Sequence, residues 1–127
     1  ATRTPSETRE KATLARGRVR EMIADCWNKN HYVIDPHTAC GYYVMQQMPR
    51  DPLTPRVLLS TASPYKFPRD VLAALGETAP ESDFAAMAAL NVKTGCPVPA
   101  SLSVLNTLPV RFNTVIEPAA IRDAALK

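Results

Sequence analysis

Hydrophobic residues recur at helical spacing along the first quarter of the chain. They form one apolar stripe, made of Ala12, Ala15, Val19, Met22, Ile23 and Cys26. Thr4, Pro5 and Glu7 mark a helix start, because threonine caps helices, proline suits the first helical position and glutamate follows the cap by three residues. The pattern therefore predicts an amphipathic helix from residue 4 to about residue 28, whose apolar stripe packs into a core.

A second helix is predicted from Asp35 to about Met48. Asp35 is a favourable N-cap, and Pro36 suits the first helical position. His37 and Cys40 stand three residues apart on this helix, a spacing that two ligands of one zinc ion can have. Because the chain has only one other histidine and no acid spaced to join them, a local hydrogen-bonding role for His37 is favoured and no metal site is predicted.

The most informative pattern is the run Val57-Leu58-Leu59, whose apolar residues are continuous rather than alternating. Such a run is typical of a short strand that is buried on both faces. It ends at Ser60 and Thr61, and the prolines at positions 64 and 68 cannot continue a strand but can open a helix. Strand, hydroxyl-rich turn and helix follow one another in this order at the carboxyl edge of an open α/β sheet, where ligands bind.

The rest of the chain is predicted to be mainly helical. The predicted elements are a helix over 68–75, a helix over 83–94, an extended segment over 96–99, an edge strand over 111–116 and a final helix that opens at Pro118. Ser82 is expected to cap the start of the middle helix. Gly76 and Gly95 are expected to end their helices in the left-handed conformation.

Two short strands among five or six helical segments cannot form a conventional sheet on their own. A strand buried on both faces needs a neighbour on each side, and this chain hardly supplies them. The predicted fold class is therefore helix-rich α/β with few strands within this chain, as the closing part of a larger α/β domain. Residues 1–127 are expected to form one domain, with a helical part over 4–48, a strand and ligand-binding edge over 56–68 and a helical tail over 69–127.

Composition mainly excludes classes of protein. The 46% of hydrophobic and 21% of charged residues are those of a globular rather than a disordered protein. No apolar run approaches the roughly 20 residues of a membrane span, and the polar N-terminus lacks the apolar core of a secretory signal. Three widely separated cysteines indicate reduced thiols, so the expected location is the cytoplasm.

The net charge of +3 is concentrated in residues 1–30, which carry seven basic and four acidic residues. A basic helix of this kind could bind nucleic acid through Arg9, Arg16 and Arg20. Because the acids are interleaved with the bases, a solvated face with internal ion pairs is the favoured interpretation. We therefore expect neither a nucleic acid nor a membrane as a partner.

Two motifs resemble the threonine synthase family. The first runs from Tyr32 to Ala39 and reads YVIDPHTA, and the second runs from Leu59 to Pro68 and reads LSTASPYKFP. Their order and spacing match the family, and the segment GCPVP at 95–99 fits its C-terminal region. The resemblance extends over about residues 6–127 and implies the last quarter to third of a fold-type-II enzyme that depends on pyridoxal 5'-phosphate. The family's Schiff-base lysine and phosphate-binding loop lie upstream, so no catalytic residue is expected here, and the fragment alone is expected to be inactive and to bind no cofactor.

By this resemblance, Thr61 is the residue that hydrogen-bonds the pyridine nitrogen of the cofactor. A hydroxyl can donate to an unprotonated ring nitrogen, whereas a carboxylate would stabilise the protonated ring. Ser60 is the second candidate for cofactor binding. The possible site-lining residues are Ser63, Lys66, Asp35 and His37. Each has an alternative: the hydroxyls can satisfy a local turn, Lys66 can be solvated, and a role in starting the helix is favoured for Asp35 and His37.

The implied reaction converts O-phospho-L-homoserine and water to L-threonine and phosphate. It removes protons at Cα and Cβ, eliminates phosphate from Cγ and adds water at Cβ. O-phospho-L-homoserine would then be the small-molecule partner of the full-length enzyme. The alternative hypothesis is a free-standing α-rich protein-interaction domain without catalytic activity. Exposed sheet edges would also be expected to let the fragment self-associate.

Overall fold

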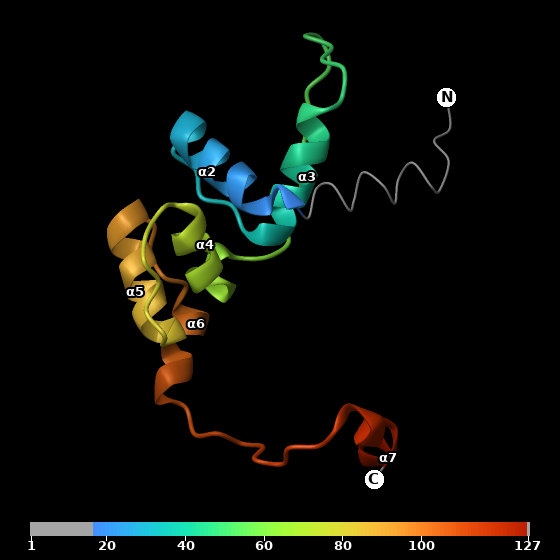
Figure 1. Ribbon diagram of the computed structural model, residues 1–127, viewed down its shortest axis with the longest axis vertical. Helices are drawn as coiled ribbons and strands as arrows, with labels where there is room; N and C mark the ends of the chain where they lie inside the picture. Colours follow the sequence, from blue (N-terminus) through green and yellow to red (C-terminus); the bar gives the residue numbers. More distant parts are fainter. Residues whose placement is uncertain (1–16, 127) are drawn as a thin grey trace.

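The computed structural model describes residues 17–126, so the helix start predicted at residues 4–7 lies outside the described residues. Within the described range the chain is helix-rich, as predicted, and contains no β-strand (Figure 1). Its α-helices are α2 (Val19–Asn30), α3 (Pro36–Gln46), α4 (Pro68–Ala74), α5 (Asp83–Thr94), α6 (Ala100–Ser103) and α7 (Ile121–Ala125). Its 3₁₀ turns are η1 (Pro64–Lys66), η2 (Val104–Thr107) and η3 (Pro118–Ala120). None of the described helices combines the length and the hydropathy needed to cross a bilayer.

The helix boundaries largely follow the cap residues visible in the sequence. Asp35 accepts hydrogen bonds from backbone amides at the start of α3, and Pro36 occupies the first position of that helix. Ser82 caps α5 through its side chain, and Gly95 ends α5 with a φ of 71°. The end of α2 is different, because the left-handed residue there is His31, with a φ of 51°, where glycine is the usual choice.

Three helix contacts build the core: α2 packs on α3 and on α4, and α4 packs on α5 (Figure 1). The buried hydrophobic residues are Ile23, Cys26, Val33, Ile34, Ala39, Tyr65, Val71, Leu72, Ala86, Met87 and Leu90. Ile23, Leu72 and Leu90 are among the largest fully buried side chains and come from α2, α4 and α5. The core therefore runs from α2 through α4 to α5, and α3 joins it by packing on α2.

The two predicted strands are wrong for the described residues. The run 57–59, expected to be a strand buried on both faces, has no strand assignment, and Val57 and Leu59 are 82% and 77% exposed. The segment 111–116, expected to be an edge strand, is irregular as well. A strand exists only when its backbone pairs with a neighbour, and no described segment pairs with either run.

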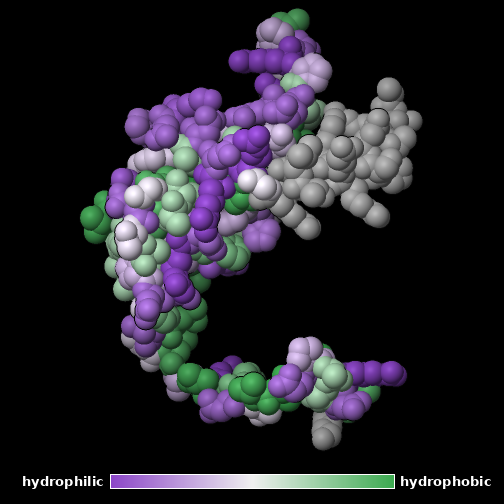
Figure 2. Space-filling view, viewed as in Figure 1, coloured by the Kyte–Doolittle hydropathy of each residue, from purple (hydrophilic) through white to green (hydrophobic). Residues whose placement is uncertain are grey.

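After η2 the chain leaves the helical core as an arm that begins at Leu108 and ends with η3 and α7 (Figure 1). The helix predicted to open at Pro118 is present as these two short elements. Hydrophobic residues are exposed along the arm (Figure 2), and Phe112 and Val115 are 82% and 94% exposed. Among the described helical elements, α7 makes its main contact with η3, so the arm adds little to the core.

Candidate functional site

The segment that follows the proline-rich connector lies along one face of α3. A guanidinium nitrogen of Arg56 (Nη1) donates to the carbonyl oxygen of Met45 at 2.6 Å. Leu58 lies so close to Gly41 that a Cβ added to this glycine would be 2.7 Å from Leu58 Cδ1. The hydroxyl oxygen of Ser60 is 3.0 Å from that of Thr38.

These contacts have the periodicity of an extended chain on a helix. Positions 56, 58 and 60 alternate, as side chains on one face of an extended segment do. Their partners at positions 45, 41 and 38 are spaced by four and three residues, which places them on one face of α3. The segment therefore runs antiparallel to α3, with its even-numbered side chains against the helix.

The odd-numbered side chains of this segment point the other way. Val57 and Leu59 are 82% and 77% exposed, and Thr61 is exposed as well. The hydroxyl of Thr61 has no hydrogen-bond partner among residues 17–126. The segment thus presents an outward face, made of Val57, Leu59 and Thr61, which combines two exposed apolar side chains with one exposed hydroxyl.

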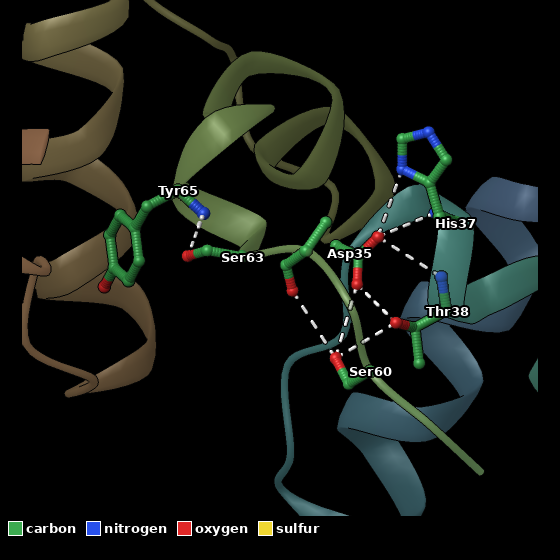
Figure 3. A network of polar contacts seen from close by, with 7 residues as sticks. Asp35, His37, Thr38, Ser60, Ser63 and Tyr65 are labelled. Atoms are coloured by element: carbon green, nitrogen blue, oxygen red, sulfur yellow. Dashed lines mark hydrogen bonds and ion pairs between the residues drawn. The ribbon is translucent and has the colours of Figure 1, made fainter.

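A buried carboxylate joins the start of α3 to this segment (Figure 3). Asp35 is completely buried, and its Oδ1 accepts hydrogen bonds from the amides of His37 at 2.8 Å and Thr38 at 3.2 Å. Its Oδ2 accepts a hydrogen bond from the Thr38 hydroxyl and another from the Ser60 hydroxyl at 3.4 Å. The carboxylate therefore caps the helix with one oxygen and holds two hydroxyl groups with the other.

The hydrogen bonds determine the charge state of Asp35. Burial raises the pKa of its carboxyl group, but the hydroxyl and amide of Thr38 and the amide of His37 lower it by more. The pKa is therefore below its ordinary value, and the group is ionised at neutral pH. A buried charge is stable only when it is well hydrogen-bonded, so each of these bonds matters to the fold.

His37 lies at the rim of this network. Its Nδ1 is 3.3 Å from Asp35 Oδ1, its ring centroid is 5.1 Å from that of Phe67, and most of its side chain is exposed. His37 and Cys40 share α3, but no group of three His, Cys, Asp or Glu side chains in the described part of the chain is arranged to hold a metal ion. The contacts of His37 are thus with the cap of α3 and with the residue before α4.

The turn after Thr61 is held by different contacts. The hydroxyl oxygen of Ser63 accepts a hydrogen bond from the amide of Tyr65 at 3.2 Å and so caps η1. The Tyr65 ring is buried, and its hydroxyl donates to the carbonyl oxygen of Cys96, beyond the end of α5. Lys66 is exposed beside them. The turn is therefore fixed to α5 on one side, while Lys66 remains available to solvent or to a ligand.

The structure brings together only part of the predicted site. Asp35, His37 and Ser60 meet in one network, whereas Ser63 belongs to the neighbouring turn. Two residues that position these groups were missed by the sequence reasoning, namely Thr38 and Tyr65. The sequence does contain a signal for Thr38, because a hydroxyl residue three positions after an N-cap aspartate lies in the first helical turn beside it. The sequence contains no such signal for Tyr65, since the carbonyl that its hydroxyl binds belongs to Cys96, 31 residues away.

Comparisons with known proteins place this chain in a family. The family model described as "Threonine synthase, C-terminal" matches residues 38–124. Threonine synthase-like 2 from Homo sapiens is 43% identical over 58 residues, or 44% of this chain. Threonine synthase from Corynebacterium glutamicum is 42% identical over 55 residues, or 43% of this chain.

The aligned segments cover only 12% of the human protein and 11% of the bacterial one, so this chain spans a small part of their length. No solved structure shows a significant match. The family match nevertheless covers well over half of the chain and includes α3 from Thr38, the outward face and the turn at Ser63. This chain therefore belongs to the threonine synthase C-terminal family.

Proposed function

We propose that this chain is the C-terminal portion of a threonine synthase that uses pyridoxal 5'-phosphate to convert O-phospho-L-homoserine and water to L-threonine and phosphate. Membership of the family supports the enzyme class. The outward face supports the assignment of a site, because the Thr61 hydroxyl is exposed there and has no hydrogen-bond partner among the described residues. The three free cysteines suit action in the cytosol.

The residues present fit one part of the cofactor. When bound, pyridoxal phosphate supplies an electron sink for proton removal next to the amino group. Thr61 would donate its hydroxyl proton to the unprotonated ring nitrogen, which moderates that sink because the ring stays neutral. Lys66, exposed in the next turn, would contact a phosphate or a carboxylate as a point charge. The chain offers these groups for binding and orientation, and the proton-transferring lysine belongs to the preceding part of the enzyme.

The same segment supports a larger α/β domain. No backbone-to-backbone hydrogen bond involves residues 56–62 within the described range, so the amides and carbonyls of residues 56–61 could pair with a neighbouring strand. The carbonyl oxygen of Ala62 accepts a hydrogen bond from the Ser60 hydroxyl at 3.4 Å. Val57 and Leu59 expose apolar side chains on the face opposite α3. In the proposed enzyme this segment is a strand of a sheet that the rest of the polypeptide supplies, with α3 covering one face of that sheet.

The test uses the full-length polypeptide that carries this chain, loaded with cofactor. Thr61→Val is expected to shift the cofactor absorbance and reduce turnover, because the ring nitrogen loses its hydrogen-bond donor. Thr61→Ser keeps a hydroxyl and is expected to retain the spectrum. Thr107→Val is the matched control, since the hydroxyl of Thr107 bonds only locally, to the carbonyl of Val104 at 2.8 Å. An unchanged spectrum and rate in Thr61→Val would remove Thr61 from the site.

A second candidate function is a free-standing α-rich protein-interaction domain. The exposed apolar side chains of the arm, including Phe112 and Val115, favour it because contiguous exposed apolar surface commonly binds a partner. The two candidates differ in the size of the natural polypeptide. An antibody raised against this chain would detect a species near 13.9 kDa for the interaction domain and a much larger one for the enzyme.

A further inference from the structure

The four residues Leu59–Ala62 span the interval between two anchors. Before them, Leu58 packs against Gly41 of α3. After them, Ser63 caps η1, which Tyr65 ties to the loop beyond α5. No regular secondary structure and no backbone-to-backbone hydrogen bond restrains the interval within the described residues. Its conformation must therefore come from side chains.

Ser60 supplies the side-chain restraint in this interval. Its hydroxyl oxygen is 3.0 Å from that of Thr38 and 3.4 Å from Asp35 Oδ2, and it also lies 3.4 Å from the carbonyl oxygen of Ala62 (Figure 3). The Asp35 carboxylate is fully buried and fixed by the two amides of the α3 cap, so it is a rigid acceptor. Hydrogen bonds to charged groups are about twice as strong as those between neutral groups.

We propose that Ser60 is a positioning residue for Thr61, whose hydroxyl it directs away from α3 by binding the Thr38–Asp35 pair. Neighbouring side chains of an extended segment point to opposite faces, so holding Ser60 on α3 fixes Thr61 on the outward face. This assignment rests on the proposed function, in which Thr61 meets the cofactor ring. It gives Ser60 a role through Thr61 rather than by contact with the cofactor.

The first test needs no cofactor. Nuclear magnetic resonance relaxation of the chain gives the backbone order parameters of Thr61 and Ala62, which are about 0.85 for a rigid backbone and below about 0.6 for a flexible one. Ser60→Ala is expected to move both residues from the first range to the second. Ser60→Thr retains a hydroxyl and is expected to preserve the order. The matched control is Ser103→Ala, because the Ser103 hydroxyl bonds within its own helix, to the carbonyl of Ala100 at 3.1 Å.

Folding should survive these changes. Ser60 is exposed, and Asp35 keeps its bonds to the α3 amides and to Thr38 in Ser60→Ala. Thr38→Ser and Thr38→Val form an independent pair that keeps or removes the other hydroxyl. Thr38→Val is expected to loosen Thr61, and Thr38→Ser is not. Unchanged order parameters at Thr61 in both Ser60→Ala and Thr38→Val would overturn the assignment.

The second test uses the full-length polypeptide with bound cofactor. Ser60→Ala is expected to shift the cofactor absorbance in the same direction as Thr61→Val, and Ser60→Thr is expected to restore it. The two ideas fail separately. If Thr61→Val leaves the spectrum unchanged, the proposed cofactor contact is wrong, whatever the order parameters show. If Thr61→Val shifts the spectrum but Ser60→Ala leaves both spectrum and order unchanged, only the positioning role is wrong.

Discussion

Replacing Asp35 tests whether one buried carboxylate holds together the start of α3 and the segment beside it. Removing an N-cap side chain costs about 1 kcal/mol. Leaving the nearly buried Thr38 hydroxyl without its charged acceptor costs about 1–2 kcal/mol more, toward the lower end because Ser60 remains within reach. Asp35→Ala is therefore expected to lower the free energy of unfolding by about 2–3 kcal/mol.

Two variants separate the contributions to this loss. Asp35→Asn keeps a good cap but loses the charge, so it is expected to cost about 1 kcal/mol. Asp51→Ala is the matched control, because Asp51 makes the same kind of local contacts, with the amide of Leu53 and the hydroxyl of Thr54, but is exposed and starts no helix. It is expected to change the stability very little.

Urea denaturation followed by circular dichroism measures these differences. With a slope of roughly 1–3 kcal/mol per molar urea, a loss of about 2–3 kcal/mol in Asp35→Ala should lower the midpoint by about 0.7–3 M. The pH dependence has a definite sign. The folded-state pKa of Asp35 is below its ordinary value of about 3.9, so its stabilisation is present above that pH and is lost as the pH falls toward the folded-state pKa. The difference in the free energy of unfolding between wild type and Asp35→Asn should therefore shrink below about pH 4. A difference that stays constant down to pH 3 would refute this reasoning. So would a loss of stability in Asp35→Ala that is no greater than in Asp51→Ala.

Three further predictions concern the surroundings of the site. Gly41→Ala gains about 1 kcal/mol of helix propensity but pushes Leu58 aside at a cost of about 1–3 kcal/mol. It is therefore expected to be neutral or destabilising alone and stabilising in a Leu58→Ala background. A double-mutant cycle measured by urea denaturation tests this. Tyr65→Phe removes a hydroxyl that donates to the carbonyl oxygen of Cys96 beyond α5. It is expected to lower the free energy of unfolding by about 1 kcal/mol in the same assay. An unchanged free energy of unfolding would mean that the ring alone anchors the turn. Leu59→Lys and Leu53→Lys are expected to change the stability of the isolated chain equally little, because both side chains are exposed. In the full-length polypeptide, Leu59→Lys is expected to lower the melting temperature more than Leu53→Lys does. Equal shifts of the melting temperature there would argue against a covered outward face.

Local rules predicted the helix boundaries where a cap residue announces them. The pair Asp35-Pro36 marked the start of α3, and Ser82 and Gly95 marked both ends of α5, because each acts on backbone groups a few residues away. The end of α2 at His31 escaped prediction, since a left-handed histidine has no strong sequence signal. The motifs predicted the family, whereas the placement of Thr61 remains a prediction that the proposed cofactor experiment has to test.

The site was only partly predictable because its geometry depends on contacts between distant residues. Ser60 reaches Asp35 across 25 positions, and Arg56 reaches Met45 across 11. Periodicity shows which residues share a face of one element, but it does not show which elements pack together. The antiparallel placement of the segment along α3 therefore required the structure, and with it came the finding that Ser60 faces the helix while Thr61 faces outward.

The apolar run 57–59 was predicted to be a strand buried on both faces, but in the structure only one of its faces is covered. Val57, Leu58 and Leu59 are apolar on both faces, yet α3 covers only the face that carries Leu58. Burying a valine or leucine side chain fully stabilises a protein by about 1.5–3 kcal/mol, so covering Val57 and Leu59 would contribute about 3–6 kcal/mol. A typical hydrogen bond contributes about 1 kcal/mol, so a few backbone hydrogen bonds to a neighbouring strand would add a stabilisation of similar size. Apolar burial and backbone pairing would therefore both stabilise the docking of this segment. In the proposed enzyme the segment is itself a strand of the sheet, so other parts of the polypeptide would cover its outward face and bury Val57 and Leu59. The same parts would bring bound groups up to Thr61, so the burial of two apolar side chains and the presentation of one hydroxyl belong to one arrangement.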